Sequence, residues 1–292
     1  MEKLAELHHI ETACNVEEPS YAVEAFFQRS LSAHLPLPAF KKLQQTTVLV
    51  AGLGGGSNIA ELLARKGIGH LIIADPDIFE PHNIRQRGHT ISALGKSKTA
   101  IMYKRLTDIS PGISVTPIYE GITLDNVAGL VQQSDYIMDM IDFSALREKA
   151  ALYRSARKRG KMVITAPSVV NGAVLYVFAP AGISFEQFFG YEDGLPMHEL
   201  GPRVMRRIVP RYPTEAPEAL YQAAARGERT IPLDAVGVEQ AAVLAVAAIE
   251  NLVLGRLERV VTIPKGIHVD TSDVSYLGRI VDYSAEFGGY TC

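Results

Sequence analysis

The stretch from Val48 to Asp77 constrains the fold more than any other part of the sequence. It begins with a short apolar run typical of a buried strand, continues into the glycine-rich turn GLGGGS at residues 52–57, and then has apolar residues at helical spacing. A second apolar run, at residues 71–74, follows the helix and ends at Asp75. Strand, turn, helix and strand form a complete βαβ unit, which predicts a parallel sheet.

The glycine turn and the acidic end of the second strand predict a nucleotide site. Glycines allow the backbone to approach a phosphate, the helix N-terminus presents N–H groups and a positive dipole to it, and Asp75 can hold ribose hydroxyls. We expect Ser57 or Asn58 to cap the helix and Gly67 to end it. The pattern alone fits an NAD-binding domain, an ATP site or a tight turn without a ligand, so the choice depends on residues further along the chain.

Composition places the chain among globular proteins with a substantial core. It has 292 residues, of which 47% are hydrophobic and 21% charged, enough for one large or two small domains. No apolar run approaches the roughly 20 residues that span a bilayer, and the N-terminus is acidic, so we expect no membrane partner and a cytoplasmic location. A net charge of −3 argues against a general nucleic-acid partner. The two cysteines, Cys14 and Cys292, are too few for a disulfide framework or structural zinc, and we interpret them as bystanders.

The order of expected elements predicts an α/β fold with a Rossmann-like doubly wound, mostly parallel sheet and helices on both faces. A glycine-, proline- and arginine-rich stretch, which includes GPRVMRRIVPRYP, lacks periodicity and is interpreted as an irregular insertion or crossover region. We expect a last strand at residues 259–263. The single domain, 1–292, then has an N-terminal helical arm (1–46), a nucleotide-binding core (47–179), the crossover or substrate region (180–230), a core or dimer helix with the last strand (231–263) and a tail (264–292).

Polar residues after the βαβ unit distinguish a triphosphate site from a dehydrogenase. A proline-rich loop after the second strand carries amide and cationic side chains suited to phosphates and carboxylates, and Lys98 lies near the start of the next helix. A further buried strand contains Asp139 and ends at Asp142, where parallel sheets bind ligands. The loop residues are Asp75, Asp77, Asn83, Arg85, Gln86 and Arg87.

Taken together, these residues resemble the ThiF/MoeB/HesA family of ubiquitin-activating-type adenylyltransferases. The resemblance covers roughly residues 29–178, returns in the small-residue helix at 236–254, and includes Arg147. It implies that Gly52, Gly54 and Gly55 approach the nucleotide phosphates and that Asp75 binds the ribose. The other residues that it implies in nucleotide binding are Asp77, Asn83, Arg85, Gln86, Arg87 and Lys98.

The resemblance also implies the catalytic groups. Arg85, Lys98 and Asp142 would act on ATP, with Asp142 as the carboxylate that works with Mg²⁺, and Arg29 would reach the site from the second subunit of a homodimer. Family members usually have Asn-x-x-Arg-Gln, whereas Asn83 and Arg85 are one residue closer, so either Arg85 or Arg87 can contact the phosphates.

These implications lead to one main function and three alternatives. The main prediction is an ATP-dependent adenylyltransferase that activates the C-terminal carboxylate of a ubiquitin-like or sulfur-carrier protein, or of a peptide, with release of pyrophosphate. The alternatives are a dehydratase of the same family that adenylates a carboxylate on a tRNA or small molecule, an NAD-dependent oxidoreductase, and an inactive peptide-binding scaffold. Because residues 180–230 contain no cysteine, the nucleophile that takes the acyl group is not identified.

Overall fold

The computed structural model describes residues 35–110, 112–211, 218–229, 233–273 and 277–287. The chain divides into two units, Met1–Pro36 and Leu37–Cys292, and the site lies in the second. Arg29, Cys14 and Cys292, for which the sequence made specific predictions, lie outside the described residues.

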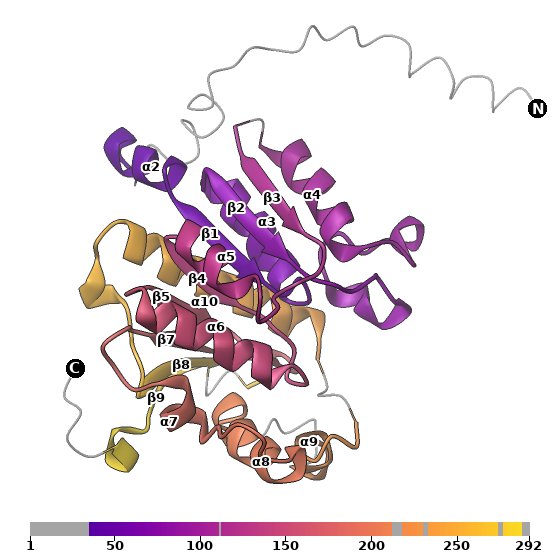
Figure 1. Ribbon diagram of the computed structural model, residues 1–292, viewed down its shortest axis with the longest axis vertical. Helices are drawn as coiled ribbons and strands as arrows, with labels where there is room; N and C mark the ends of the chain where they lie inside the picture. The colour runs from indigo at the N-terminus through magenta and orange to yellow at the C-terminus, as the bar shows by residue number, and fades with distance from the viewer. Residues whose placement is uncertain (1–34, 111, 212–217, 230–232, 274–276, 288–292) are drawn as a thin grey trace, which may run out of the picture. The chain divides into compact units, whose positions relative to one another are not determined.

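A nine-stranded sheet organises this second unit, in the order β3-β2-β1-β4-β5-β7-β8-β9, with β6 paired to β7 (Figure 1). The first five strands in this order are parallel, and β7, β8 and β9 continue the sheet antiparallel, which confirms the predicted mostly parallel Rossmann-like architecture. The strands are β1 (Thr47–Ala51), β2 (His70–Ala74), β3 (Ser114–Ile118), β4 (Tyr136–Asp139), β5 (Met162–Thr165), β6 (Ser168–Val169), β7 (Gly172–Phe178), β8 (Lys265–Asp270) and β9 (Leu277–Asp282).

Helices cover both faces of the sheet (Figure 1). On one face α3 packs against α4 and α10, and on the other α5 packs against α6. The strands between them are buried almost completely because they are apolar on both sides. The helices are α2 (Leu37–Gln44), α3 (Gly56–Lys66), α4 (Lys98–Ile109), α5 (Val127–Gln133), α6 (Leu146–Lys158), α7 (Phe185–Phe189), α8 (Met197–Ile208), α9 (Glu218–Ala225) and α10 (Ala235–Val253), with short 3-10 helices η3 (Pro81–Arg85), η4 (Ile91–Ala93), η5 (Leu257–Arg259) and η6 (Ser284–Phe287).

The predicted C-terminal end of helix α3 is confirmed, but its predicted N-cap is wrong. Gly67 ends the helix in the left-handed conformation, with φ +91°, as expected. The N-cap, however, is Gly55 and no side chain caps the helix, so the expected capping by Ser57 or Asn58 is wrong. Ser57 instead lies inside the first turn, where its hydroxyl donates to the carbonyl of Gly54 at 2.9 Å. The first N–H groups of α3 are therefore without a capping side chain.

The stretch expected to be irregular, 180–230, contains helices α7, α8 and α9. The apolar residues of α8 recur at one face, with Leu200, Val204 and Ile208 buried four residues apart. Arginines and a proline between them hide this period in the sequence. The helices add an aromatic cluster against the sheet, in which Phe188 packs edge-on against Tyr176 and Phe178.

The C-terminal part of the sheet also differs from the prediction. Residues 260–263 form no strand, and the preceding turn is the 3-10 helix η5. Strands β8 and β9 lie instead in the stretch interpreted as a tail. Burial alternates along β8, but the buried positions include His268 and Asp270, so hydrophobicity does not reveal the alternation.

Helix α10 accounts for the longest apolar segment. Within the described part of the chain it alone is long and apolar enough to cross a membrane, with a mean hydropathy of 1.5, but half of that window is buried inside the protein. It packs against α3 and β7, and its Gly237 allows close contact because a Cβ there would lie 2.1 Å from the carbonyl oxygen of Val170. These contacts identify α10 as a core helix.

Candidate functional site

The candidate site lies at the carboxyl edge of β1, β2 and β4, where the strand order reverses between β1 and β4. Gly52 follows β1 directly, with φ +93°, and a Cβ at this position would lie 2.3 Å from the carbonyl oxygen of Met140. Only glycine fits there. At Gly54, by contrast, the single atom that a Cβ would meet within 4 Å is Nε2 of Gln86, at 3.8 Å. The loop is therefore packed tightly on the sheet side and open at Gly54, next to the N-terminus of α3.

Asp75 joins this loop to the end of β2. Its Oδ2 accepts a hydrogen bond from the N–H of Leu53 at 2.5 Å, and its Oδ1 accepts one from the N–H of Asp77 at 2.8 Å. Burial raises the pKa of Asp75, and Lys98 and the two N–H groups oppose that rise. Each carboxylate oxygen has a second lone pair, so the side chain can also accept hydrogen bonds from a ribose.

Lys98 is the first residue of α4 and its ammonium group turns into the site. Nζ lies 2.9 Å from Oδ2 of Asp77 and 4.0 Å from Oδ1 of Asp75, and the side chain is 7% exposed. The backbone holds it there, because the N–H of Lys98 donates to the carbonyl of Asp77 and Ser97 caps α4. A buried cation beside the glycine loop is suited to bind a phosphate.

Arg85 ends the 3-10 helix η3 and provides a second cation. Its Nη1 donates to the carbonyl of His82 at 2.6 Å, and no carboxylate among the described residues lies within ion-pair distance. Burial lowers the pKa of Arg85, while the nearby charge of Asp142 acts in the opposite direction. The guanidinium is thus partly desolvated, electrostatically linked to Asp142, and open to an anion.

Arg87 is held differently. Its Nε and Nη2 donate to the two carboxylate oxygens of Glu239, both at 2.9 Å, and Nη1 lies 3.0 Å from Oε1 of Glu61. Hydrogen bonding to Glu239 raises the pKa of Arg87. Asn58 completes the cluster, because its side chain accepts from the N–H of Arg87 and donates to Glu239. With its donors occupied in this way, Arg87 supports the loop, and the geometry favours Arg85 as the phosphate ligand.

The two amides of the loop have separate environments. Asn83 is 3% exposed and its Oδ1 accepts from the N–H of Glu80 at 2.9 Å, which closes the first turn of η3. Gln86 is 6% exposed, and its buried Oε1 has no hydrogen-bond partner among the described residues. Gln86 therefore faces the open side of the glycine loop with unused hydrogen-bonding capacity, whereas Asn83 stabilises the local turn.

The acidic pair after β4 divides into a buried and an exposed member. Asp139 is fully buried, where it forms an ion pair with Lys149 at 2.7 Å and accepts from the hydroxyl of Tyr153 at 2.8 Å. Burial raises the pKa of Tyr153 well above its usual value, and the negative charge of Asp139 adds to this effect. Asp139 is therefore a structural group of the core. Asp142, three residues later, is exposed at the edge of the sheet.

Asp142 has one carboxylate oxygen to which no described residue donates a hydrogen bond. Both the N–H and the hydroxyl of Ser144 donate to its Oδ1 at 2.8 Å, so Oδ2 remains available. The described residues contain no cluster of three or more His, Cys, Asp or Glu side chains that could hold a metal. Mg²⁺ commonly binds through one carboxylate together with substrate phosphates and water, and Asp142 fits that role.

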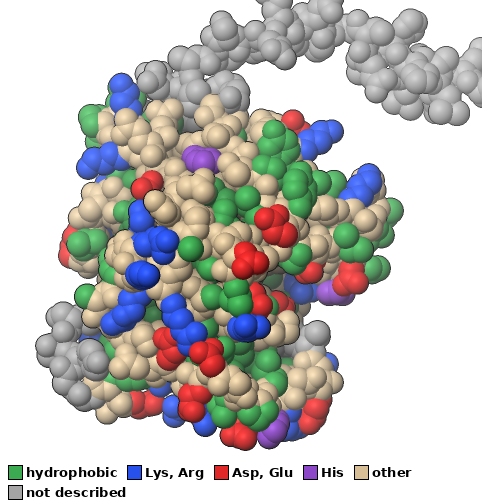
Figure 2. All heavy atoms as spheres, in the orientation of Figure 1, with side chains coloured by type: hydrophobic (Ala, Val, Ile, Leu, Met, Phe, Trp, Pro, Cys, Tyr) green, Lys and Arg blue, Asp and Glu red, His purple; other side chains and the backbone are tan. Residues whose placement is uncertain are grey.

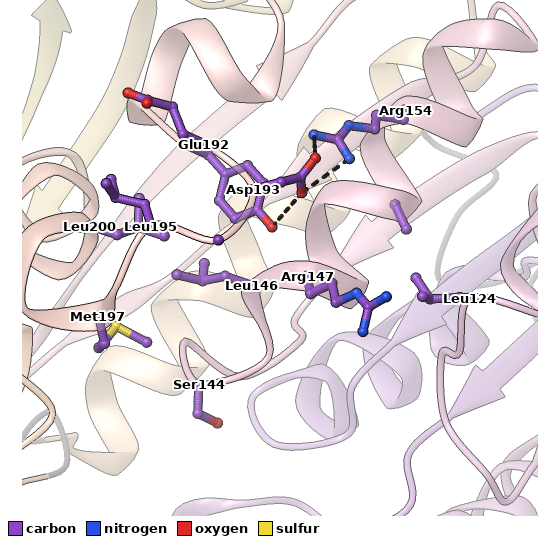
Figure 3. Close-up of a pocket in the computed structure, with 13 residues that line it drawn as sticks. Leu124, Ser144, Leu146, Arg147, Arg154, Glu192, Asp193, Leu195, Met197 and Leu200 are labelled. Atoms are coloured by element: carbon purple, nitrogen blue, oxygen red, sulfur yellow. Dashed lines mark hydrogen bonds and ion pairs between the residues drawn. The ribbon is translucent and has the colours of Figure 1, made fainter.

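A cavity of about 490 Å³ lies between α6 and residues 191–200 (Figure 3). Ser144 forms part of its wall, so the cavity begins next to the residue that positions Asp142. Arg147, whose role the sequence left unassigned, also lines it. The other lining residues are Leu124, Leu146, Ala151, Arg154, Tyr191, Glu192, Asp193, Gly194, Leu195, Met197 and Leu200.

The fold defines the class of protein, which is a Rossmann-like α/β protein in which a glycine loop, the buried carboxylate of Asp75 and the cations Arg85 and Lys98 lie at one edge of the sheet. Comparison with known families identifies it further. The ThiF family model matches residues 27–254, and the chain belongs to that family.

Two relatives illustrate the similarity in sequence. The chain is 30% identical over 148 residues to the sulfur carrier protein ThiS adenylyltransferase of Escherichia coli, a match that covers 50% of this chain and 58% of the relative. It is 35% identical over 127 residues to the tRNA threonylcarbamoyladenosine dehydratase of Haemophilus influenzae, which covers 42% and 48%. The matches thus span about half the length of these curated relatives.

Solved structures share the fold. The E. coli MccB structure with MccA-N7isoASN superposes with a TM-score of 0.64 at 19% identity, over 85% of this chain and 67% of that one. The E. coli tRNA N6-threonylcarbamoyladenosine dehydratase TcdA superposes with a TM-score of 0.57 at 20% identity, over 81% and 97%. At these identities the likeness concerns the fold alone.

Proposed function

We propose that this chain is an ATP-dependent adenylyltransferase that activates a carboxylate as an acyl-adenylate. The observation that carries the proposal is that the glycine loop, Lys98, and Arg85 with its electrostatic partner Asp142 all lie at one edge of the sheet. The diphosphate of NAD does not react and needs no metal-binding carboxylate, whereas transfer from a triphosphate requires cations, and a carboxylate that holds Mg²⁺, to neutralise the leaving pyrophosphate. The names of relatives such as the ThiS adenylyltransferase agree with this reading.

The reaction assigns a task to each group. An oxygen of the substrate carboxylate attacks the α-phosphorus of ATP, the bond to the β-phosphate oxygen breaks, and pyrophosphate leaves with the bond electrons. Gly54 and the N-terminus of α3 receive the phosphates, and Asp75 holds the ribose. Arg85 and Lys98 neutralise the charge that develops on the leaving pyrophosphate. Asp142 would hold Mg²⁺, which supplies further charge neutralisation at the phosphates when it is bound.

A screen of ATP–pyrophosphate exchange tests the proposal, because exchange reports adenylation without requiring the later acyl acceptor. Candidate acids are small carrier proteins with a free C-terminus, peptides and small carboxylic acids. We expect exchange with at least one of these classes and tight binding of ATP–Mg²⁺ in calorimetry. Tight binding of NAD with no binding of ATP would contradict the proposal.

A second candidate is a dehydratase that adenylates a carboxylate on a tRNA. It is favoured by the 35% identity to the dehydratase of H. influenzae and by a likeness in fold that covers 97% of TcdA. The net charge of −3 argues against a large nucleic-acid surface. Exchange that depends on added tRNA, and not on peptides or carrier proteins, would favour the dehydratase.

We propose further that the active unit is a homodimer in the cytoplasm, in which Arg29 acts in the partner's site. Large apolar side chains that no described residue covers support an interface: Ile84 is 78% exposed, Ile91 is 89% exposed, and Val243 of α10 is 58% exposed. Exposed apolar groups of this kind commonly mark interfaces between proteins. A second copy of the chain would cover them.

A further inference from the structure

The cavity between α6 and residues 191–200 has two chemically different sides (Figure 3). Leu146 of α6, Leu195 between α7 and α8, and Met197 and Leu200 of α8 lie on one side. The guanidinium of Arg147 lies on the other side, near Leu124 and opposite Leu195 and Met197 (Figure 3). A volume of about 490 Å³ falls within the roughly 300–1,000 Å³ typical of small-ligand sites. The cavity can therefore enclose a side chain and a short backbone segment, but not a folded domain.

A ligand without side chains would make no hydrophobic contact with the apolar side of the cavity. Leu146 and Leu200 are buried, Leu195 and Met197 are half-buried, and all four line the cavity. An apolar group placed against them would remove hydrophobic surface from water on both partners, at about 25 cal/mol per Å². A Gly-Gly tail would leave this space to water and gain nothing from it.

Arg147 is the available cation of this cavity. Figure 2 shows Lys and Arg side chains gathered over the face on which α6 lies, but most of those on α6 are occupied. Arg154 forms ion pairs with Glu186 at 2.7 Å and Asp193 at 2.9 Å, and Arg157 donates to the carbonyl of Gly182. Arg147 makes no hydrogen bond or salt bridge with any described residue, although its charge helps to lower the pKa of Asp193 across the cavity, and its guanidinium lies at the cavity wall (Figure 3).

We propose that this cavity binds the acid that becomes adenylated, and that the acid carries a bulky apolar group next to its carboxylate, as in a peptide that ends in leucine, methionine or phenylalanine. The inference rests on the proposed adenylyltransferase function and specifies its substrate. The apolar group occupies the side lined by Leu146, Met197 and Leu200, and Arg147 attracts the carboxylate. Ser144 lies between this cavity and Asp142, so an acid seated here has its carboxylate beside the phosphates.

Exchange with matched acids tests the substrate class. Acetylated pentapeptides identical except for the last residue, ending in Gly-Gly, Gly-Leu or Gly-Phe, are compared by ATP–pyrophosphate exchange. We expect kcat/KM to be at least about tenfold higher for the leucine or phenylalanine peptide, since filling a hydrophobic pocket commonly discriminates by that much. Equal rates, or a preference for Gly-Gly, would overturn the inference and leave the proposed function in place. Binding of ATP with no exchange for any acid would overturn both.

A pair of variants tests whether the preference for an apolar last residue arises in this cavity. Ala151 is half-buried and lines the cavity, so Ala151→Phe fills part of it without changing a fully buried position. Ala223 of α9 is also half-buried but lies outside the cavity lining, so Ala223→Phe is the matched control. We expect Ala151→Phe to raise KM for the leucine peptide at least about tenfold, with the Kd for ATP unchanged, and the control to behave like wild type. An unchanged KM in folded Ala151→Phe would show that the acid binds elsewhere.

Discussion

The guanidinium of Arg87 holds the carboxylate of Glu239 through two hydrogen bonds, both 2.9 Å long, and so joins the loop after β2 to helix α10. The two residues are 152 positions apart in the sequence. The same guanidinium contacts Glu61 on α3, which is almost fully buried. The loop that carries the proposed phosphate ligand is thereby fixed on two core helices, and Arg87 supports the position of its neighbour Arg85.

The first prediction separates these two arginines. Arg85→Ala removes a cation that contacts no described carboxylate, so we expect exchange activity to fall about 100-fold or more while the free energy of unfolding changes little. Arg87→Ala removes the ties to Glu239 and Glu61, so we expect a loss of stability of about 1–2 kcal/mol and exchange within about tenfold of wild type. Urea unfolding and exchange assays measure the two effects. The opposite assignment, with Arg87→Ala folded but inactive and Arg85→Ala active, would show that Arg87 contacts the phosphates.

The second prediction concerns the exposed carboxylate of Asp142. Asp142→Asn keeps an oxygen that can accept from Ser144 but removes the charge, so we expect the fold and the thermal midpoint to be preserved and exchange to fall about 100-fold or more. Asp282→Asn is the matched control, since Asp282 is also exposed and accepts from the N–H of the serine two residues later, Ser284, but lies at the end of β9, the last strand of the sheet. Near-normal exchange in Asp142→Asn would exclude this residue from metal binding and catalysis.

Local sequence patterns were sufficient for the nucleotide-binding half of the fold. The apolar strands and the glycine turn that ends at α3 carry their periodicity within a few residues, so β1, β2 and the helix stop at Gly67 follow from the sequence. The N-cap of α3 could not be predicted, because the N-cap residue is Gly55, which has no side chain that could indicate a cap. Ser57, a residue type common at N-caps, lies inside the helix instead.

Long-range contacts limited the prediction elsewhere. The role of Arg87 depends on Glu239, and nothing near either residue indicates that they meet. Similarly, β8 has polar residues at buried positions, His268 and Asp270, whose environment comes from strands far away in the sequence. Asn58 was expected only as a helix cap, whereas its side chain links α3, the loop and α10. The cavity between α6 and residues 191–200 required the fold of α7 and α8 before it could be recognised.

The third prediction is a dependence of stability on pH through His268. This side chain is 2% exposed, and burial lowers its pKa to about 4, against an ordinary value of 6.5; Asp270 opposes the shift and Arg211 adds to it. Between these values the unfolded chain binds the proton and the folded chain does not. Stability from this group is therefore complete above pH 6.5 and lost as pH falls toward 4, by roughly 3 kcal/mol.

Two variants isolate the contribution of His268. We expect His268→Gln, which does not titrate, to lose less stability than wild type between pH 7 and pH 4.5 in urea unfolding. His198 is 68% exposed on α8, so His198→Gln should follow the wild-type curve. Parallel curves for wild type and His268→Gln would mean that the pKa of His268 is the same in the folded and the unfolded chain.

The last prediction concerns the assembly. If Arg29 of one subunit acts on ATP in the other, then Arg29→Ala and Asp142→Ala each inactivate a homodimer, because every site lacks one group. A heterodimer of the two variants has one site that combines an intact Asp142 with the intact Arg29 of the Asp142→Ala subunit. We therefore expect co-refolded mixtures to recover up to about a quarter of wild-type exchange, since half of the dimers are mixed and one of their two sites is complete. If Arg29 acts within its own subunit, the sites of a mixed dimer each lack one group and exchange stays at the level of the separate variants. Differently tagged subunits, purified as the mixed dimer, make the comparison independent of how efficiently they associate.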